Sequence, residues 1–124
     1  PSREIQAHQH SGAGTAPRET VRSQPVEALE IVEADLRAAR SFYESWRTDG
    51  SGYLQARFHE TVRWIGWNPE LFTRKHRFFR RAIIRNTYFG IFFVIEPDVT
   101  TIVAVLDLRQ RPSAIRRVLT KRRQ

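Results

Sequence analysis

The chain has 124 residues, of which 40% are hydrophobic, and a formal net charge of +8 at pH 7. It contains no Cys, which excludes disulfides, thiolate metal sites and Cys nucleophiles. No apolar run approaches the roughly 20 residues of a membrane span, and no signal-peptide core is visible, so we expect a soluble cytoplasmic protein without a membrane partner.

Residues 1–25 are rich in Gln, Ser, Gly, Ala and Pro and show no hydrophobic periodicity. This composition predicts a disordered N-terminal tail, followed by one domain over residues 26–124. His8 and His10 lie in the tail, and His59 and His76 have no ligand spacing between them. We therefore expect no metal site, and the absence of a glycine-rich phosphate loop ahead of a helix predicts no cofactor.

Two helical patterns follow a short apolar run, residues 26–31, that predicts a first strand. From about Glu33 apolar residues recur at spacings of three and four, until the turn residues 49–52 interrupt them. A second helix is predicted from there to Asn68-Pro69, because proline cannot donate a backbone amide and biases its predecessor away from helix. The apolar stripes are Leu36, Ala39, Tyr43 and Trp46, then Leu54, Phe58, Val62 and Ile65. The two helices are expected to form a hairpin.

Three strands and a last helix are predicted after the hairpin. Residues 76–85 alternate as a half-exposed strand does, and Asn86-Thr87 forms a turn. Residues 88–95 are apolar on both faces and predict a central strand, in which Gly90 permits a close approach or a bulge. Residues 99–106 form the next strand, and Pro112-Ser113 opens the final helix. This order predicts a two-layer α+β fold: a helical hairpin packed on a small antiparallel β-sheet, with a C-terminal helix.

Positive charge is concentrated in the C-terminal part of the chain. Residues 26–72 carry eight acids and five Arg, a net −3, whereas residues 73–124 carry thirteen Lys or Arg and three acids, a net +10. Such a charge asymmetry produces a positive surface potential that attracts anionic partners. The alternative interpretation is that the basic residues only form a solvated face that keeps the protein soluble. Arg outnumbers Lys 19 to 2, and Arg recognises carboxylate or phosphate with two parallel hydrogen bonds. The composition favours an anionic partner over a small apolar ligand.

Short motifs occur in a characteristic order between residues 26 and 117. Ala34-Asp35-Leu36 and Phe42-Tyr43-Glu44 lie in the first predicted helix, and Asn68-Pro69 ends the second. Residues 88–93 are predicted to form an aromatic strand. Residues 104–112 contain the end of an aliphatic strand followed by an Arg-containing turn. In this order and spacing the chain resembles the ParE/RelE superfamily of toxins from bacterial type II toxin–antitoxin systems. The resemblance implies the fold predicted from the hydrophobic patterns.

RelE-like members of this superfamily cleave mRNA on the ribosome. That chemistry needs cationic groups on the scissile phosphate and a group that helps the 2′-hydroxyl attack. Three positions at which the resemblance implies such groups read Gly90, Asp107 and Ile115 in this chain. If the chain is nevertheless a nuclease, the groups left to hold the phosphate are Arg81, Arg109 and Arg111.

ParE-like members, which the chain resembles more closely, lack this nuclease set, bind DNA gyrase and trap its cleaved-DNA complex. The resemblance therefore implies a target-binding surface in the basic segment 109–123 and no catalytic residues. We assign this surface to Arg109, Arg111, Arg116, Arg117 and Lys121. The alternative is that these side chains only solvate an end helix whose apolar side, Ile115, Val118 and Leu119, packs on the sheet.

Toxins of this superfamily are held by an acidic antitoxin whose C-terminal segment folds as it binds across the sheet and the hairpin. The resemblance implies a hetero-oligomer of this kind, for which exposed aromatic and cationic side chains are suited. We assign the antitoxin-binding surface to Trp64, Trp67, Phe72, Arg80 and Arg81. For the aromatic members, the alternative is an ordinary place in the core.

The sequence leaves several functions open. The leading hypothesis is a growth inhibitor that binds gyrase and is neutralised by its antitoxin. The first alternative is a ribosome-dependent mRNA endonuclease, and the second is a non-toxic binding module of the same fold. An unrelated nucleic-acid-binding domain would instead show an affinity that falls steeply with salt, because it neutralises phosphates.

Overall fold

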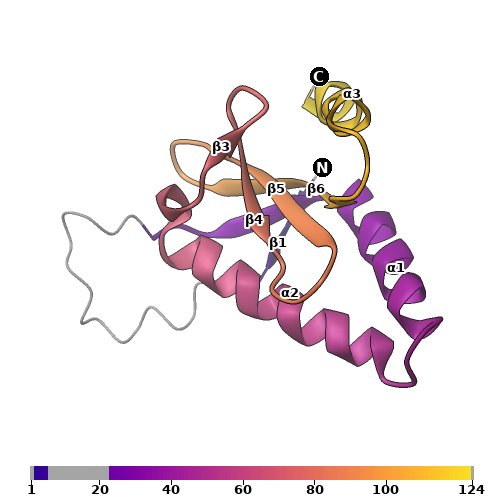
Figure 1. Cartoon of the computed structure of the whole chain (residues 1–124). Coiled ribbons are helices and arrows are strands. Elements are labelled where there is room, and N and C mark those ends of the chain that lie inside the picture. The colour runs from indigo at the N-terminus through magenta and orange to yellow at the C-terminus, as the bar shows by residue number, and fades with distance from the viewer. Residues whose placement is uncertain (1, 6–22, 124) are drawn as a thin grey trace.

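The computed structural model describes residues 2–5 and 23–123, which form one sheet and a set of helices around it. The elements are β1 (Ser2–Ile5), β2 (Val26–Leu29), α1 (Ile31–Glu44), α2 (Gly50–Trp67), the 3-10 helix η2 (Pro69–Leu71), β3 (Arg74–Lys75), β4 (Phe79–Ile83), β5 (Phe89–Ile95), β6 (Thr100–Asp107) and α3 (Pro112–Arg123). The strand order is β1-β2-β6-β5-β4-β3. The fold is α+β with a helical hairpin and a C-terminal helix, as the sequence predicts (Figure 1).

The sheet separates two hydrophobic cores. The helical hairpin packs on one face, where Phe58 and Phe93 are fully or almost fully buried. On the other face, α3 places Ile115 and Leu119 against a second core that contains Phe92. Neighbouring residues of β5 thus enter different cores, as the alternation of side chains along a strand requires. Figure 1 shows the hairpin and α3 on opposite sides of the sheet, so α3 adds a partial third layer to the predicted two.

The two helices of the hairpin follow their apolar stripes. In α1 the buried residues Val32, Leu36, Ala39 and Tyr43 lie at helical spacing. The second helix begins at Gly50, inside the segment predicted as a turn, and ends where the Asn68 side chain accepts a hydrogen bond from Glu70 N at 3.2 Å. Among the helices of the described residues, none combines the length and the apolarity needed to cross a bilayer.

The meander β4-β5-β6 is antiparallel as predicted, and β5 is buried along almost its whole length between its two neighbours. The sheet as a whole is mixed, because β2 pairs in parallel with β6, with Val26 opposite Thr100. The predicted antiparallel sheet is therefore present as the meander, and β2 adds one parallel pair to it. Hydrophobic alternation identifies strands, but it does not show whether two strands run parallel or antiparallel. For β2 that direction is set by the helical hairpin that connects it to the rest of the sheet.

A tight turn occupies the first residues of the segment that was predicted as a strand over residues 76–85, which is a strand only from Phe79 to Ile83. Residues 74–75 form β3, and β4 starts only at Phe79. Between them His76 and Arg77 adopt positive φ angles of 53° and 74°. Turns of this kind normally contain Gly, Asn or Asp, so the sequence carried no signal for it. The irregularity in the β5–β6 pairing likewise lies opposite Phe92/Phe93, where Val103 is the extra residue of β6, and not at Gly90.

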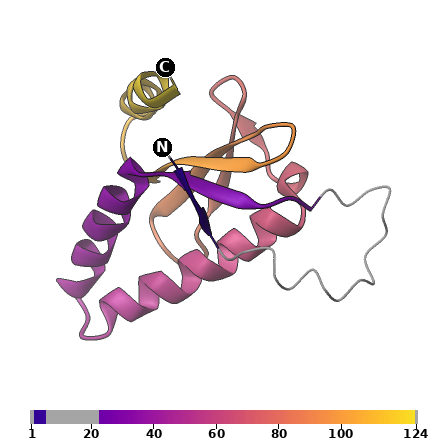
Figure 2. The same ribbon diagram turned by 180° about the vertical axis from the view of Figure 1, so that it is seen from behind.

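A strand occupies part of the predicted N-terminal tail. Residues 2–5 form β1, which pairs antiparallel with β2, from Ser2 opposite Leu29 to Ile5 opposite Val26 (Figure 2). Residues 24 and 25 are also fixed, since Pro25 O accepts a hydrogen bond from Thr100 N at 2.9 Å. The prediction of disorder is therefore wrong for these residues. The rest of the predicted tail, residues 6–22 with His8 and His10, lies outside the described residues.

Candidate functional site

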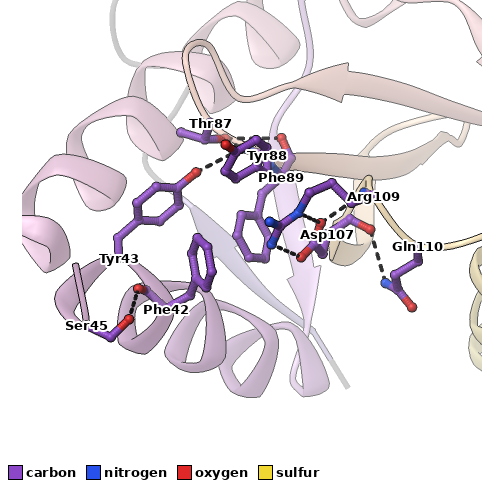
Figure 3. Close-up of polar contacts among 9 residues, drawn as sticks. All are labelled: Phe42, Tyr43, Ser45, Thr87, Tyr88, Phe89, Asp107, Arg109 and Gln110. Atoms are coloured by element: carbon purple, nitrogen blue, oxygen red, sulfur yellow. Dashed lines mark hydrogen bonds and ion pairs between the residues drawn. The ribbon is translucent and has the colours of Figure 1, made fainter. Parts of the chain in front are cut away.

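Arg109 is fixed directly after β6 by the carboxylate of Asp107. This carboxylate accepts hydrogen bonds from Arg109 N at 2.9 Å, Nε at 3.0 Å and Nη2 at 2.7 Å. The Gln110 side chain donates to the Asp107 carbonyl at 3.2 Å and closes the same loop. The loop turns the Arg109 guanidinium back toward β5 and α1 (Figure 3).

Aromatic rings from α1 and the start of β5 form the surface on which Arg109 lies. Its guanidinium carbon is 4.1 Å from the centre of the Tyr88 ring and 5.0 Å from that of Phe42, within the range of cation–π attraction. The Tyr43 hydroxyl accepts a hydrogen bond from Tyr88 N at 2.9 Å and so ties α1 to β5. Half of the Arg109 side chain is exposed. It is held on one side and accessible on the other.

The ion pair shifts the protonation of both partners. Hydrogen bonding from Arg109 lowers the pKa of Asp107, although burial opposes this shift. The same contact raises the pKa of Arg109. The carboxylate is therefore ionised at neutral pH and offsets the guanidinium charge, so a phosphate at Arg109 has to compete with Asp107.

The pair gives a pH-dependent contribution to stability that can be measured. Because the folded-state pKa of Asp107 lies below its ordinary value of 3.8, this contribution is complete above that pH and is lost as the pH falls through the lowered pKa. We expect Asp107→Asn to lower Tm slightly at about pH 6 and hardly at all at about pH 2, since an exposed pair is worth little. Thermal unfolding followed by circular dichroism checks this, and an equal loss at both pH values contradicts it.

Gly90 lies where the resemblance to RelE-like nucleases implies a phosphate-binding Arg. A Cβ at this position would be 3.0 Å from both terminal methyl carbons of Leu108, closer than ordinary van der Waals contact. The space is therefore filled by a leucine from the loop after β6. Neither a larger side chain nor a phosphate has room at this point unless Leu108 moves.

The three Arg residues of the nuclease alternative do not converge. Arg81 stands opposite Phe92 in the β4–β5 pairing and faces the core beneath α3. Arg109 instead lies against Phe42 of α1, on the side of the hairpin. Arg111 is exposed just before α3, and its carbonyl accepts hydrogen bonds from Ala114 N and Ile115 N. No single phosphate contact that uses all three side chains is formed in this arrangement.

The exposed side of α3 carries a cluster of cations next to β3 and β4. Arg116, Arg117 and Lys121 line a shallow open groove along α3 together with Ser113 and Thr120. The ring of His76 has its pKa lowered by burial and by the charges of Arg116, Lys75 and Arg81, which places these cations near one another. We name this surface the cationic face: Lys75, Arg81, Arg116, Arg117 and Lys121. It unites three of the five predicted target-binding residues, whereas Arg109 lies apart and Arg111 at the helix start.

The residues predicted to bind an antitoxin lie mostly around the C-terminal end of α2. Trp64 is 53% exposed and contacts Trp67 edge to face, with 5.7 Å between ring centres. Phe72 packs on Phe93 at 5.9 Å, and the Arg80 guanidinium donates to the Phe72 carbonyl at 2.7 Å. Phe72 thus belongs partly to the core, while Trp64 is available at the surface. Arg81 is separated from this group, on the other face of the sheet.

One ion pair important for the site was not predicted from the sequence. Arg122 of α3 donates to both carboxylate oxygens of Asp35 in α1, at 2.6 and 2.9 Å, and to Val103 O at 3.1 Å. Asp35 also accepts a hydrogen bond from Val105 N at 2.9 Å. The signal was present, because Asp35 lies three residues after Val32 and four before Ala39 on the buried stripe of α1. A carboxylate on such a stripe requires a partner.

Two comparisons with known proteins identify no relative of this chain. No protein-family model matches the chain, and a search of curated proteins finds none that matches it. The resemblance to ParE/RelE toxins therefore stays a prediction made from the sequence. The function of the chain has to be inferred from its own residues and from their geometry.

Proposed function

We propose that this chain is the toxin of a type II toxin–antitoxin system, which inhibits growth by binding DNA gyrase in the cytoplasm and is neutralised by an acidic antitoxin. The observation that carries the proposal is the cationic face formed by α3 with β3 and β4. Residues 71–95 and 108–124 together contain thirteen Lys or Arg and no Asp or Glu. A surface of this kind attracts an anionic partner over long range and selects against cationic ones.

The arrangement around Gly90 and Arg109 favours target binding over RNA cleavage. A nuclease of the RelE kind needs free cations that converge on one phosphate. Here Leu108 occupies the space beside Gly90, Asp107 offsets the charge of Arg109, and Arg81 lies on another face. The binding hypothesis does not require these groups to converge on one phosphate, because it uses the exposed charge of α3, outside the loop between β6 and α3.

The proposal is tested by inducing the chain in a bacterial host without an antitoxin and following plasmid supercoiling and protein synthesis in parallel. We expect supercoiling to fall and cleaved DNA to accumulate while translation continues. Arrested translation with cut mRNA would establish the endonuclease alternative. Normal growth at a verified level of folded protein would leave only the non-toxic binding module.

Charge reversal on α3 tests whether the cationic face contacts the target. We expect the double variant Arg116→Glu/Arg117→Glu to need at least about tenfold more inducer for the same growth inhibition, because like charges that face each other across an interface cost several kcal/mol. Both side chains are exposed, so the fold should be retained. The matched control is Arg37→Glu/Arg63→Glu, which changes the net charge equally at exposed positions of α1 and α2. Equal loss in both variants would mean that only the net charge matters.

A further inference from the structure

A small aromatic hollow opens between the turn of the helical hairpin and the β4–β5 turn. It has a volume of about 210 Å³ and brings together segments that are far apart in the sequence. Its walls are formed by Tyr43, Trp46, Tyr53, Asn86, Thr87 and Tyr88, with Arg47 at its border. None of these residues belongs to the cationic face or to the predicted antitoxin-binding group. The hollow is therefore a separate candidate for binding.

Hydrogen bonds hold the walls of the hollow in place. Tyr43, which is only 2% exposed, accepts from Tyr88 N, and the Tyr53 hydroxyl donates to Asn86 O at 2.9 Å. Trp46 and Tyr88 remain 55% and 42% exposed. The Arg109 guanidinium lies over the Tyr88 ring, so Trp46 offers the larger free aromatic surface. Trp and Tyr are enriched among the residues that contribute most to binding at protein interfaces. The hollow is thus formed before any partner arrives.

The size and polarity of the hollow select one kind of occupant. Its volume is below the roughly 300 Å³ at which small-molecule sites begin, so it suits a single side chain better than a cofactor. Aromatic walls favour an aromatic ring in edge or offset contact. The Tyr43 hydroxyl uses its oxygen to accept the Tyr88 amide, and no acceptor for its proton is found among the described residues. A carbonyl or hydroxyl of the partner can take that hydrogen bond.

The charges at the border favour a partner with carboxylates. The guanidinium groups of Arg47 and Arg57 lie 4.2 and 3.9 Å from the centre of the Tyr53 ring. Arg47 is paired with Asp49 at 2.7 Å. Arg57 lies behind the Tyr53 wall, where its guanidinium donates to Tyr53 O, and its buried Nε has no hydrogen-bond partner among the described residues. Within this part of the chain, one positive charge is therefore left without an acid. A nucleic acid carries a phosphate at every nucleotide, so one of its phosphates would also be repelled by the Asp49 carboxylate. A protein segment can place a single carboxylate next to Arg57 and none next to Asp49.

We infer that this hollow receives an aromatic side chain from an acidic segment of a partner protein. The identity of that partner as the antitoxin rests on the proposed function, whereas the chemistry of the hollow does not. The inference moves the main anchor point from Trp64 and Trp67 to Trp46 and Tyr88. It predicts that a short peptide with one aromatic ring between carboxylates binds here without the rest of the partner.

The test is a ¹H–¹⁵N NMR titration of the full chain with a blocked acidic pentapeptide that has Phe at its centre. We expect saturable shifts of the Asn86, Thr87 and Tyr88 amides and of the Trp46 indole, with a Kd on the order of millimolar for so small a ligand. Trp46→Ala should weaken binding at least about fivefold. Trp64→Ala, at a side chain of similar exposure, should leave it unchanged.

Several outcomes would overturn the inference. If a peptide that differs only in having Ala at its centre binds with the same Kd, the binding depends on the carboxylates alone and not on the aromatic ring. Shifts centred on Trp64 and Trp67, or no saturable shifts, would place the anchor elsewhere. A short oligothymidylate that binds the same residues more tightly than the Phe peptide would identify a nucleobase as the occupant. Binding of the Phe peptide by a chain that fails to inhibit growth would refute the proposed function and leave the inference intact.

Discussion

Replacing Arg122 by Ala is expected to lower the free energy of unfolding by about 3–5 kcal/mol, because it leaves the buried carboxylate of Asp35 without its counter-charge. The side chains of Arg122 and Asp35 are only 17% and 10% exposed. Urea unfolding measures the loss. Hydrogen exchange should locate it, with α3 losing protection first, since Arg122 is the residue that ties this helix to α1.

The size of this effect follows from the position of the ion pair at the open edge of β6. The strand β2 covers that edge only as far as Ile102. Beyond it, Arg122 donates to Val103 O, and Asp35 accepts from Val105 N, so the pair supplies the hydrogen bonds that a neighbouring strand would give. Removing either side chain leaves backbone groups as well as a charge unsatisfied.

Two variants separate this explanation from a general sensitivity of α3. Arg123→Ala should cost much less, since Arg123 is exposed and its only described contact is with the Phe78 ring at 5.3 Å. Replacing both partners by apolar residues, Asp35→Leu with Arg122→Met, should restore part of the lost stability, because no buried charge remains. A double variant as unstable as the sum of the two single variants would show that the charge pair is not the cause.

Local patterns were sufficient for most of the fold. The buried stripe of α1 and the apolar run of β5 predicted a hairpin helix and a central strand, and both are confirmed. The turn at His76 and Arg77 was missed because neither residue is typical of positive φ. The parallel pairing of β2 with β6 was missed because strand direction depends on the whole path of the chain.

The candidate site was less accessible to sequence reasoning. Asp107 and Arg109 are two residues apart, so their pairing could be read locally. The aromatic hollow joins Tyr43 to Tyr88, 45 residues away, and no local pattern records such a contact. The same limit applies to Asp35 and Arg122, which are 87 residues apart. Sequence identified which residues carry charge and aromatic surface, and the fold decided which of them meet.

Gly50→Ala is expected to be strongly damaging, because the helices of the hairpin approach each other closely at this residue. A Cβ at this position would lie 2.0 Å from Tyr43 O and 2.2 Å from Tyr43 C, so backbone of α1 would have to move. Overpacking usually costs about 1–3 kcal/mol, and we expect a loss of about 3 kcal/mol or more, since no flexible side chain can yield. Urea unfolding of the variant measures it.

Gly52→Ala is the matched control, two residues further along the first turn of α2. A Cβ there meets no atom within 4 Å, and alanine favours a helix over glycine by about 1 kcal/mol. The control should therefore be as stable as the wild type or slightly more stable. If both variants lose stability equally, the close approach of Gly50 to α1 is not the reason.

The same pair of variants connects the hairpin to the aromatic hollow. Gly50 sets the distance between the end of α1, which carries Tyr43 and is followed by Trp46, and the start of α2, which carries Tyr53. Moving α1 away by even part of the overlap would separate these walls. We therefore expect Gly50→Ala, in the conditions where it remains folded, to lose the NMR shifts caused by the Phe peptide, and Gly52→Ala to retain them. Retained binding in Gly50→Ala would mean that the hollow does not depend on how closely the two helices approach.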